Sequence, residues 1–356
     1  MITAKHNGAP TLMDVAALAS VSRATASRAL GGYGAVSPRV RGRVEEAAAL
    51  LGYRPNSVAR SVRTGKTSTI GVVVADMGNP FFSQTTRGIS DNARRHGYQV
   101  VVVNTDEDLE SEKLGIQLLL DKRVDGIVVA STSRTVSGHL TDVQSEGFPL
   151  VLLDRRIDGI ICDRVTADNK AGSRLAFRSL INTGHRRIAF VSAAPDSFEN
   201  GAWLSGVVSS GADRIEAYLE AMADVLDTCR PDTYLRRAGF ADGASYSATR
   251  ELLRMAKPPT AVFASDSVVG IEVLWAIRDA GLLVPRDVSF VMGDDVPWVL
   301  ATNPAISAIA QPAYEMGIRT VELVLDRVTD TARPARVIVL PTIFNERGSI
   351  AAPRTE

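Results

Sequence analysis

Short apolar runs alternate with amphipathic segments along most of the chain after residue 68. Seven of these runs are rich in valine or isoleucine and are short enough to be buried strands. They span residues 70–75, 99–104, 126–130, 150–154, 187–192, 260–264 and 288–292. Because helical segments separate them, they predict parallel sheets with right-handed crossovers. The sequence therefore favours an α/β core.

The first part of the chain has a different pattern, in which short amphipathic runs predict helices. Thr11 followed three residues later by Asp14 is typical of a capping box at the start of a first helix. Ser22 is a suitable N-cap for a second helix over residues 23–30, whose small apolar residues recur at helical spacing. The turn between these two helices is only a few residues long. This arrangement is typical of a helix-turn-helix.

A third helix is predicted directly after these two. Ser37 can cap it, Pro38 occupies its first position, and Gly52 is a suitable stop at its end. Three such helices can bury one small shared core. We expect this head to be all-α and separate from the α/β core, although the helical pattern alone also fits a purely structural bundle.

The charge of the chain is divided unevenly between the two regions. Residues 1–66 contain ten Lys or Arg and three Asp or Glu, a net charge of +7, whereas the remainder contains thirty and thirty-seven, a net charge of −7. A basic head on an acidic body suits a polyanion at one end of the molecule, because phosphate neutralisation supplies most sequence-independent affinity for DNA. The same net charge would also be found on a basic surface that is exposed to solvent and binds no partner.

Length and composition exclude several other classes. At 356 residues, with 45% hydrophobic and 22% charged residues, the chain can form a two-lobed core and a smaller appendage. The sequence has no apolar run of membrane-spanning length, and the first ten residues do not resemble a signal peptide, so we expect a cytoplasmic protein. Cys162 and Cys229 are expected to be reduced, and the four scattered histidines predict no metal site. No cofactor is expected.

The second helix of the head carries the candidate DNA-reading residues. In a helix-turn-helix this helix enters the major groove, so that side chains near its start reach base edges while flanking hydroxyl groups contact phosphates. Arginine can bond guanine through two hydrogen bonds, and a small apolar side chain can contact the methyl group of thymine. The candidate base-reading residues are Arg23, Ala24 and Arg28, and the candidate phosphate contacts are Thr11, Ser22, Thr25 and Ser27.

Polar side chains follow the predicted strands of the core. Parallel sheets bind ligands at the carboxyl ends of their strands, so these loops predict a cleft for a small molecule. Each aspartate could equally be a helix cap or a turn residue. The candidates by position are Asp76, Asn79 and Phe81, then Asp154 with Arg155, Asp266 with Ser265, and Asp294 with Asp295.

Residues 11–74 carry a resemblance to a known family. TLMDVAALASVSRATASRAL and the later VSPRVRGRVEEAAALLGYRPNSVARSVRTGKTSTIGVVV are similar to the N-terminal signature of the LacI family of repressors. The resemblance implies a flexible arm over residues 1–10, a DNA-binding domain over 11–55, a hinge helix and linker over 56–67, and a core over 68–356. It also implies that the hinge folds on operator DNA and inserts Val62 into the minor groove; the implied hinge residues are Asn56, Ala59, Arg60 and Val62.

The core also resembles that of the LacI family, which is shared with periplasmic binding proteins. The resemblance implies two Rossmann-like lobes, the first over about residues 68–166 and 311–331 and the second over about 167–310 and 332–350. It implies that Asp294 grips the effector and that Trp298 caps the cleft. An arginine clamp is usual, and Arg214 at the start of a helix is the best candidate, although residues 197–212 are an insertion before it.

The resemblance and the chemistry of the loops together favour a sugar or a sugar derivative as the effector. Carboxylates accept hydrogen bonds from vicinal hydroxyl groups, and an aromatic face covers the apolar side of a sugar ring. Purines stay open as alternatives, as does the choice between an inducer and a corepressor. We expect a homodimer that represses transcription from a palindromic operator.

Two other functional classes share parts of this pattern. A secreted solute-binding protein would have the core but not the basic head. An enzyme would need a nucleophile beside a base, a glycine-rich phosphate loop or a metal cluster, and the strand-end acids are spread over separate loops instead. Neither class fits as well as a transcription regulator.

Overall fold

The computed structural model describes residues 10–53, 65–195, 204, 206–223, 225 and 233–354. It divides into two compact units, Met1–Thr67 and Ser68–Glu356. The implied hinge residues Asn56, Ala59, Arg60 and Val62, and nearly all of the arm, lie outside the described residues.

The described residues of the head form three helices, α1 (Leu12–Leu18), α2 (Arg23–Gly31) and α3 (Pro38–Leu51). Thr11 and Asp14 form the predicted capping box on α1, and Ser22 and Ser37 cap α2 and α3. The small residues on the inner faces, among them Val15 and Ala26, are fully buried and allow the three helices to approach closely. The predicted three-helix head is therefore confirmed.

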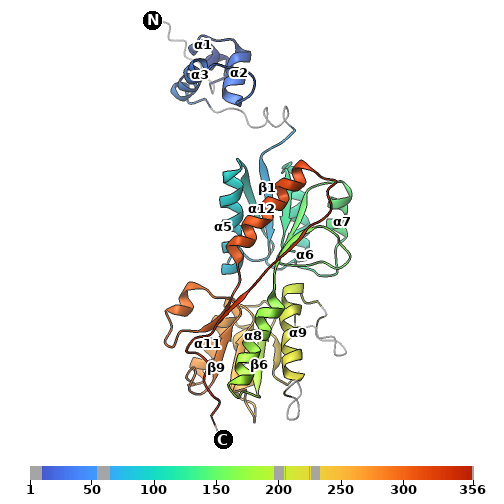
Figure 1. The fold of residues 1–356 in the computed structure, drawn as a ribbon, viewed down its shortest axis with the longest axis vertical. Coiled ribbons are helices and arrows are strands. Elements are labelled where there is room, and N and C mark those ends of the chain that lie inside the picture. Colours follow the sequence, from blue (N-terminus) through green and yellow to red (C-terminus); the bar gives the residue numbers. More distant parts are fainter. Residues whose placement is uncertain are drawn as a thin grey trace. The chain divides into compact units, whose positions relative to one another are not determined.

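The first lobe of the core is a six-stranded parallel sheet with helices on both faces (Figure 1). Helices α5 (Pro80–Arg95) and α12 (Ala313–Thr329) pack together on one face, and α6 (Leu109–Asp121) and α7 (Gly138–Ser145) contribute to the apolar cluster on the other. The strand order is β11 (Val337–Leu340), β5 (Asp163–Ala167), β4 (Leu150–Leu153), β3 (Gly126–Val129), β1 (Thr69–Val74) and β2 (Gln99–Asn104).

The second lobe repeats the same order of strands. Helices α8 (Asn169–Asn182) and α9 (Ser209–Ala223) share one apolar cluster with its sheet, and α10 (Ala244–Leu253) and α11 (Ser267–Asp279) share another. All neighbouring strands are parallel except β12, which is antiparallel to β10. The order is β12 (Ile343–Asn345), β10 (Ser307–Ala310), β9 (Ser289–Met292), β8 (Ala261–Ala264), β6 (Ile188–Ser192) and β7 (Leu235–Arg237).

The two lobes are connected by three crossings of the chain. The first lies between β5 and α8, the second between β10 and α12, and the third between β11 and β12. Strand β11 pairs with β5 in the first lobe, so the prediction that residues 332–340 belong to the second lobe is wrong. Val337–Leu340 alternate between exposed and half-buried positions along an edge strand. The sequence of such a short edge strand does not indicate to which sheet the strand belongs. Within the described residues, no helix is long and apolar enough to span a membrane.

Candidate functional site

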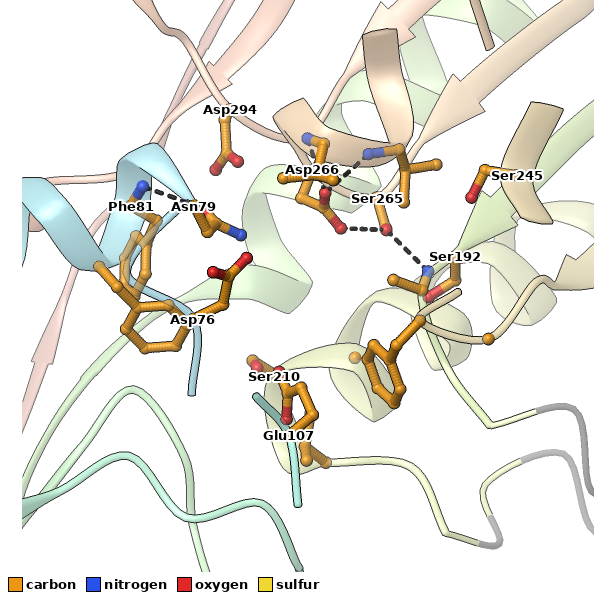
Figure 2. A pocket seen from close by; sticks show the side chains of 18 of the residues that line it. Asp76, Asn79, Phe81, Glu107, Ser192, Ser210, Ser245, Ser265, Asp266 and Asp294 are labelled. Atoms are coloured by element: carbon orange, nitrogen blue, oxygen red, sulfur yellow. Dashed lines mark hydrogen bonds between the residues drawn. The ribbon is translucent and has the colours of Figure 1, made fainter. Parts of the chain in front are cut away.

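The carboxyl ends of strands from both lobes surround one cleft with a cavity volume of about 280 Å³. Loops after β1, β2 and β4 contribute the side from the first lobe, and loops after β6, β7, β8 and β9 contribute the side from the second lobe. Figure 2 shows Asp76, Asn79 and Phe81 on one side of the open space and Asp266 and Ser265 on the other. Seven of the eight predicted effector residues line the cleft: Asp76, Asn79, Phe81, Asp154, Arg214, Asp266 and Asp294.

Asp294 lies just after β9 and is held by two hydrogen bonds. Its Oδ2 accepts from the backbone N–H of Ser267 at 2.8 Å, and its Oδ1 accepts from Nε2 of Gln311 at 2.7 Å. Burial and the nearby Asp266 raise the pKa of this carboxyl group, against the opposing charge of Arg214. Gln311 lies at the second crossing between the lobes, so Asp294 connects the cleft to this crossing.

Asp154 follows β4 and is also buried. Ser210 on α9 donates a hydrogen bond to its Oδ2 at 3.1 Å, which links the two lobes across the cleft. Its Oδ1 is buried without a hydrogen-bond partner among the described residues. Burial raises the pKa of Asp154, and the charges of Arg155 and Arg214 partly oppose this effect. A ligand with a hydrogen-bond donor would satisfy the open oxygen.

Arg214 lies on α9 and faces the cleft as predicted for a clamp. Its Nη2 donates to Oδ1 of Asn169 at 2.8 Å, and its charge acts on both Asp154 and Asp294. The helix begins at Ser209, so the prediction that Arg214 lies at the start of its helix is wrong. Ser209 to Ala212 form its buried first turn, because their side chains are small enough to pack against the neighbouring lobe and sheet. Residues 197–203 and 205 of the proposed insertion lie outside the described residues.

Trp298 is not among the residues that line the cleft. It lies in the short helix η2 (Pro297–Leu300) and packs, half-buried, against an apolar cluster of the second lobe. The aromatic side chains that do line the cleft are Phe81, Phe82 and Phe240. Phe240 is half exposed, and it follows β7, a strand of only three residues that the hydrophobic pattern did not reveal.

Sequence reasoning selected Arg155 but missed its charged partner at the cleft, Glu107. Arg155 donates from Nη2 to Oε1 of Glu107 at 2.6 Å and from Nη1 to Oε2 at 2.8 Å, and it lies over the ring of Phe82. Glu107 follows β2 closely, so the rule that ligands bind at strand ends would have found it. Ser192, Ser210 and Ser245 also line the cleft but carry no recognisable sequence signal.

On the head, the candidate base-reading residues differ in their freedom to reach DNA. Arg23 and Ala24 are exposed at the start of α2. Arg28 is half-buried and folds back along the helix, donating from Nε to the backbone oxygen of Ala24 at 3.3 Å and from Nη2 to Oγ1 of Thr25 at 3.4 Å. Both bonds are long, so DNA could compete for this guanidinium group.

The candidate phosphate contacts are hydroxyl groups that already have local partners. Thr11 bonds Asp14 within the capping box, and Ser22 accepts from the backbone N–H of Thr25 at 3.1 Å. Ser27 lies 2.7 Å from the hydroxyl oxygen of Tyr33, a residue that sequence reasoning did not select. A hydroxyl group that accepts one bond can still donate another, so these positions stay compatible with phosphate.

The head and the core together define a class of protein, namely a regulator with a helix-turn-helix joined to a two-lobed ligand-binding domain. Two family models match: "Bacterial regulatory proteins, lacI family" over residues 11–56 and "Periplasmic binding protein-like domain" over residues 177–350. Relatives that are 30% and 32% identical over more than nine tenths of the chain agree with both matches. The chain therefore belongs to the LacI family of DNA-binding transcription regulators.

Two curated relatives illustrate the similarity. Catabolite control protein A of Priestia megaterium is 30% identical over 93% of this chain and 96% of its own length. The transcriptional repressor CytR of Escherichia coli is 32% identical over 91% of this chain and 91% of its own length. The match extends over head and core alike, so the whole organisation of the chain is that of the family.

Solved structures show the same fold. The lac repressor dimer bound to operator and the anti-inducer ONPF is 26% identical, with a TM-score of 0.82 over 97% of this chain and all of that one. The regulator CelR in complex with cellobiose is 31% identical, with a TM-score of 0.69 over 96% and 99% of the two chains. A LacI-family regulator from Enterococcus faecium with bound ribose is 28% identical, with a TM-score of 0.67 over 80% and 100%.

Proposed function

We propose that this chain represses transcription as a homodimer on a palindromic operator and that a sugar or sugar derivative in the core cleft controls its affinity for DNA. The observation that carries the proposal is the cleft, where acidic, amide and aromatic side chains from both lobes surround a cavity of about 280 Å³. A cavity of this size accommodates a small ligand, and its polar groups suit hydroxyl recognition. Similar regulators are bound to cellobiose and to ribose in their solved structures.

Ligand binding at this cleft can be coupled to the relative position of the lobes. Asp154 and Ser210 lie on different lobes and are joined directly, and Asp294 is joined to Gln311 at a crossing. A ligand that contacts both sides favours one arrangement of the lobes over another, and this difference in affinity is the coupling free energy. An inducer would favour the arrangement of the lobes that binds DNA weakly, and a corepressor would favour the arrangement that binds DNA tightly.

On the DNA side, we propose that Arg23, Ala24 and Arg28 read bases and that Thr11, Ser22, Thr25 and Ser27 contact phosphates. The hinge residues Asn56, Ala59, Arg60 and Val62 would order on the operator, with Val62 as a minor-groove wedge. Seven residues between head and core are too few for a stable isolated helix, so DNA contacts would have to stabilise it. A dimer would place two heads on successive half-sites. The similar lac repressor is bound to its operator as a dimer in a solved structure.

We also propose that the chain has no catalytic activity and acts in the cytoplasm, where its DNA is. Asp266 and Asp294 at the cleft accept hydrogen bonds from backbone and side-chain donors. Among the described residues, no group of three or more His, Cys, Asp or Glu side chains could hold a metal ion. The arrangement supports binding.

The experiment that tests this function uses the full chain. An operator is first selected from a pool of random duplexes, and sugars are screened by thermal shift. Asp294→Asn should abolish the effect of the binding sugar on operator affinity while leaving sugar-free operator binding nearly unchanged. Asp142→Asn, an exposed position on α7 away from the cleft, is the matched control and should behave as the unmodified protein. A sugar response that survives in Asp294→Asn would remove this cleft as the effector site.

A further inference from the structure

The cleft carries a large excess of negative charge. Eight acidic and two basic side chains line it, a net charge of −6, whereas the whole segment after residue 66 carries −7. Nearly all of the core's net charge is therefore gathered at one site. The acidic side chains are Asp76, Asp106, Glu107, Asp154, Asp242, Asp266, Glu272 and Asp294, and the basic ones are Arg155 and Arg214.

The arginines do not offset this charge for an incoming ligand. Arg155 is paired through both of its terminal nitrogens with Glu107, it also donates to the backbone oxygen of Ser131 at 2.9 Å, and its side chain is 7% exposed. Arg214 acts on two buried carboxyl groups, Asp154 and Asp294. A negatively charged ligand would meet one guanidinium group that already has acidic neighbours, surrounded by further carboxylates.

The buried polar atoms of the cleft that lack a hydrogen-bond partner are mainly acceptors, which also favours a ligand that is not negatively charged. Oδ1 of Asp154 and Oε1 of Gln311 are buried and have no partner among the described residues. Gln311 donates from Nε2 to Asp294, which fixes its amide so that the oxygen is the open atom. Among the described lining residues, one buried donor also lacks a hydrogen-bond partner, namely Nε of Arg155. It lies 3.7 Å from Oδ2 of Asp154. These two buried acceptors therefore need donors from a ligand, which ionised phosphate and carboxylate groups cannot supply.

We propose that the effector of this chain carries hydrogen-bond donors and no negative charge, and that an amine-bearing, hydroxyl-rich molecule binds more tightly than its uncharged parent. The proposal rests on the proposed function, because it assumes that the cleft is the effector site. Hydroxyl groups satisfy the open acceptors in either molecule, and an ammonium group is in addition attracted by the surrounding carboxylates. Burial raises the pKa of Asp154 and of Asp294, and a bound cation favours their ionised forms.

The first experiment makes no assumption about the identity of the ligand. The full-length protein is incubated with a bacterial metabolite extract and freed of unbound compounds, and the retained compound is released and identified by mass spectrometry. A neutral or cationic compound that Asp154→Asn no longer retains supports the proposal. A retained phosphate or carboxylate overturns it but leaves the effector function intact. If nothing is retained, the proposed function and this proposal fail together.

The second experiment uses matched ligands in calorimetry with the full chain. Each hexose, starting with glucose and galactose, is compared with its 2-amino-2-deoxy derivative and its 6-phosphate. Where the parent sugar binds, the amine should bind more tightly and the phosphate should bind more weakly or not at all. A phosphate that binds more tightly than its parent overturns the proposal, as does an amine that binds more weakly.

A variant at the rim of the cleft isolates the contribution of charge. Asp242 is exposed and lines the cleft, so Asp242→Asn removes a charge with little effect on folding. The preference for the amine over the parent sugar should fall by about two- to fivefold, the range measured for exposed charge pairs. Asp142→Asn is the matched control and should leave the preference unchanged. An equal loss of affinity for both sugars in Asp242→Asn would show that charge does not set the preference.

Discussion

Individual polar residues at the cleft have two roles at once. Oδ1 of Asp266 caps α11 by accepting from the backbone N–H groups of Val268 and Val269 at 3.0 Å, yet Asp266 also lines the cleft. Asn79 caps α5 in the same way and also faces the cavity. A carboxylate has about four acceptor positions, so a cap leaves room for a ligand. The two interpretations that the sequence left open for Asp266, helix cap or ligand residue, are therefore compatible.

A prediction at the residue scale concerns the two arginines of α2. Arg23→Ala should cost about 1 to 3 kcal/mol on the selected operator and relax the preference at one base position, because it removes an exposed base-reading group. Arg28→Ala should cost a similar amount only if DNA draws this side chain away from Ala24 and Thr25. Affinities on operators with single base changes are the measurement. A uniform loss on all sequences would identify either residue as a phosphate contact instead.

A second prediction follows from the buried His185. Its ring lies 2.8 Å from Oγ1 of Thr260 and 2.9 Å from the backbone oxygen of Ala351, and burial lowers its pKa from the ordinary value of 6.5. The unfolded chain therefore binds a proton more readily than the folded protein. This contribution to stability is complete above pH 6.5 and is lost as the pH falls through the lowered folded pKa.

Denaturation of the full chain at several pH values tests this prediction. His185→Gln should flatten the loss of stability between neutral and mildly acidic pH, although it lowers stability at neutral pH as well. His96→Gln, which changes an exposed histidine at the end of α5, is the control and should leave the pH dependence in place. An unchanged pH profile in His185→Gln would contradict the assignment.

At the scale of elements, a close crossing of α5 and α12 supports the first lobe. The two helices meet through Gly88 and Gly317, where an added Cβ atom would overlap the backbone oxygen of Tyr314 or of Thr85 respectively. Neither contact can yield by a side-chain rotation, because both involve backbone. The crossing therefore depends on the two glycines.

Gly317→Ala should accordingly destabilise the core by about 1 to 3 kcal/mol or more, because it forces the two helices apart. Gly138→Ala, in α7 with open space around the added Cβ atom, is the matched control. It should be neutral or stabilise the core by up to about 1 kcal/mol, since alanine is the better helix former. Thermal unfolding of the two variants provides the comparison, and equal melting temperatures would exclude a tight crossing.

The elements also show what sequence reasoning could and could not predict. All seven apolar runs are strands, with bounds within one residue at each end, because buried parallel strands are continuously apolar. Strand β5 begins with Asp163, which is buried and bonded to Arg327 and Arg333. That charged network is formed by residues distant in sequence, so no local pattern could reveal it. Short β7 and the edge strands β11 and β12 likewise depend on tertiary neighbours.

At the scale of the whole molecule, charge and contacts divide the chain at the same place. The net charge of +7 in residues 1–66 coincides with the compact unit Met1–Thr67, and the acidic remainder coincides with the unit that contains the cleft. The proposed DNA-reading residues and the cleft therefore lie in separate compact units.

The last prediction tests this division. Residues 67–356 alone should fold, because the core has its own apolar clusters on both faces of both sheets. In the absence of DNA, the fragment should bind the effector sugar with the same affinity as the full chain. Its specific binding to the operator, and the salt dependence of that binding, should be lost. Calorimetry with the sugar and titration of the operator at several salt concentrations measure the two properties.

By reciprocity, any effect of operator on sugar affinity seen in the full chain should disappear in the fragment. Specific operator binding by the fragment would show that the core itself recognises DNA, and a sugar affinity that falls on truncation without DNA would show that the head contributes to the effector site.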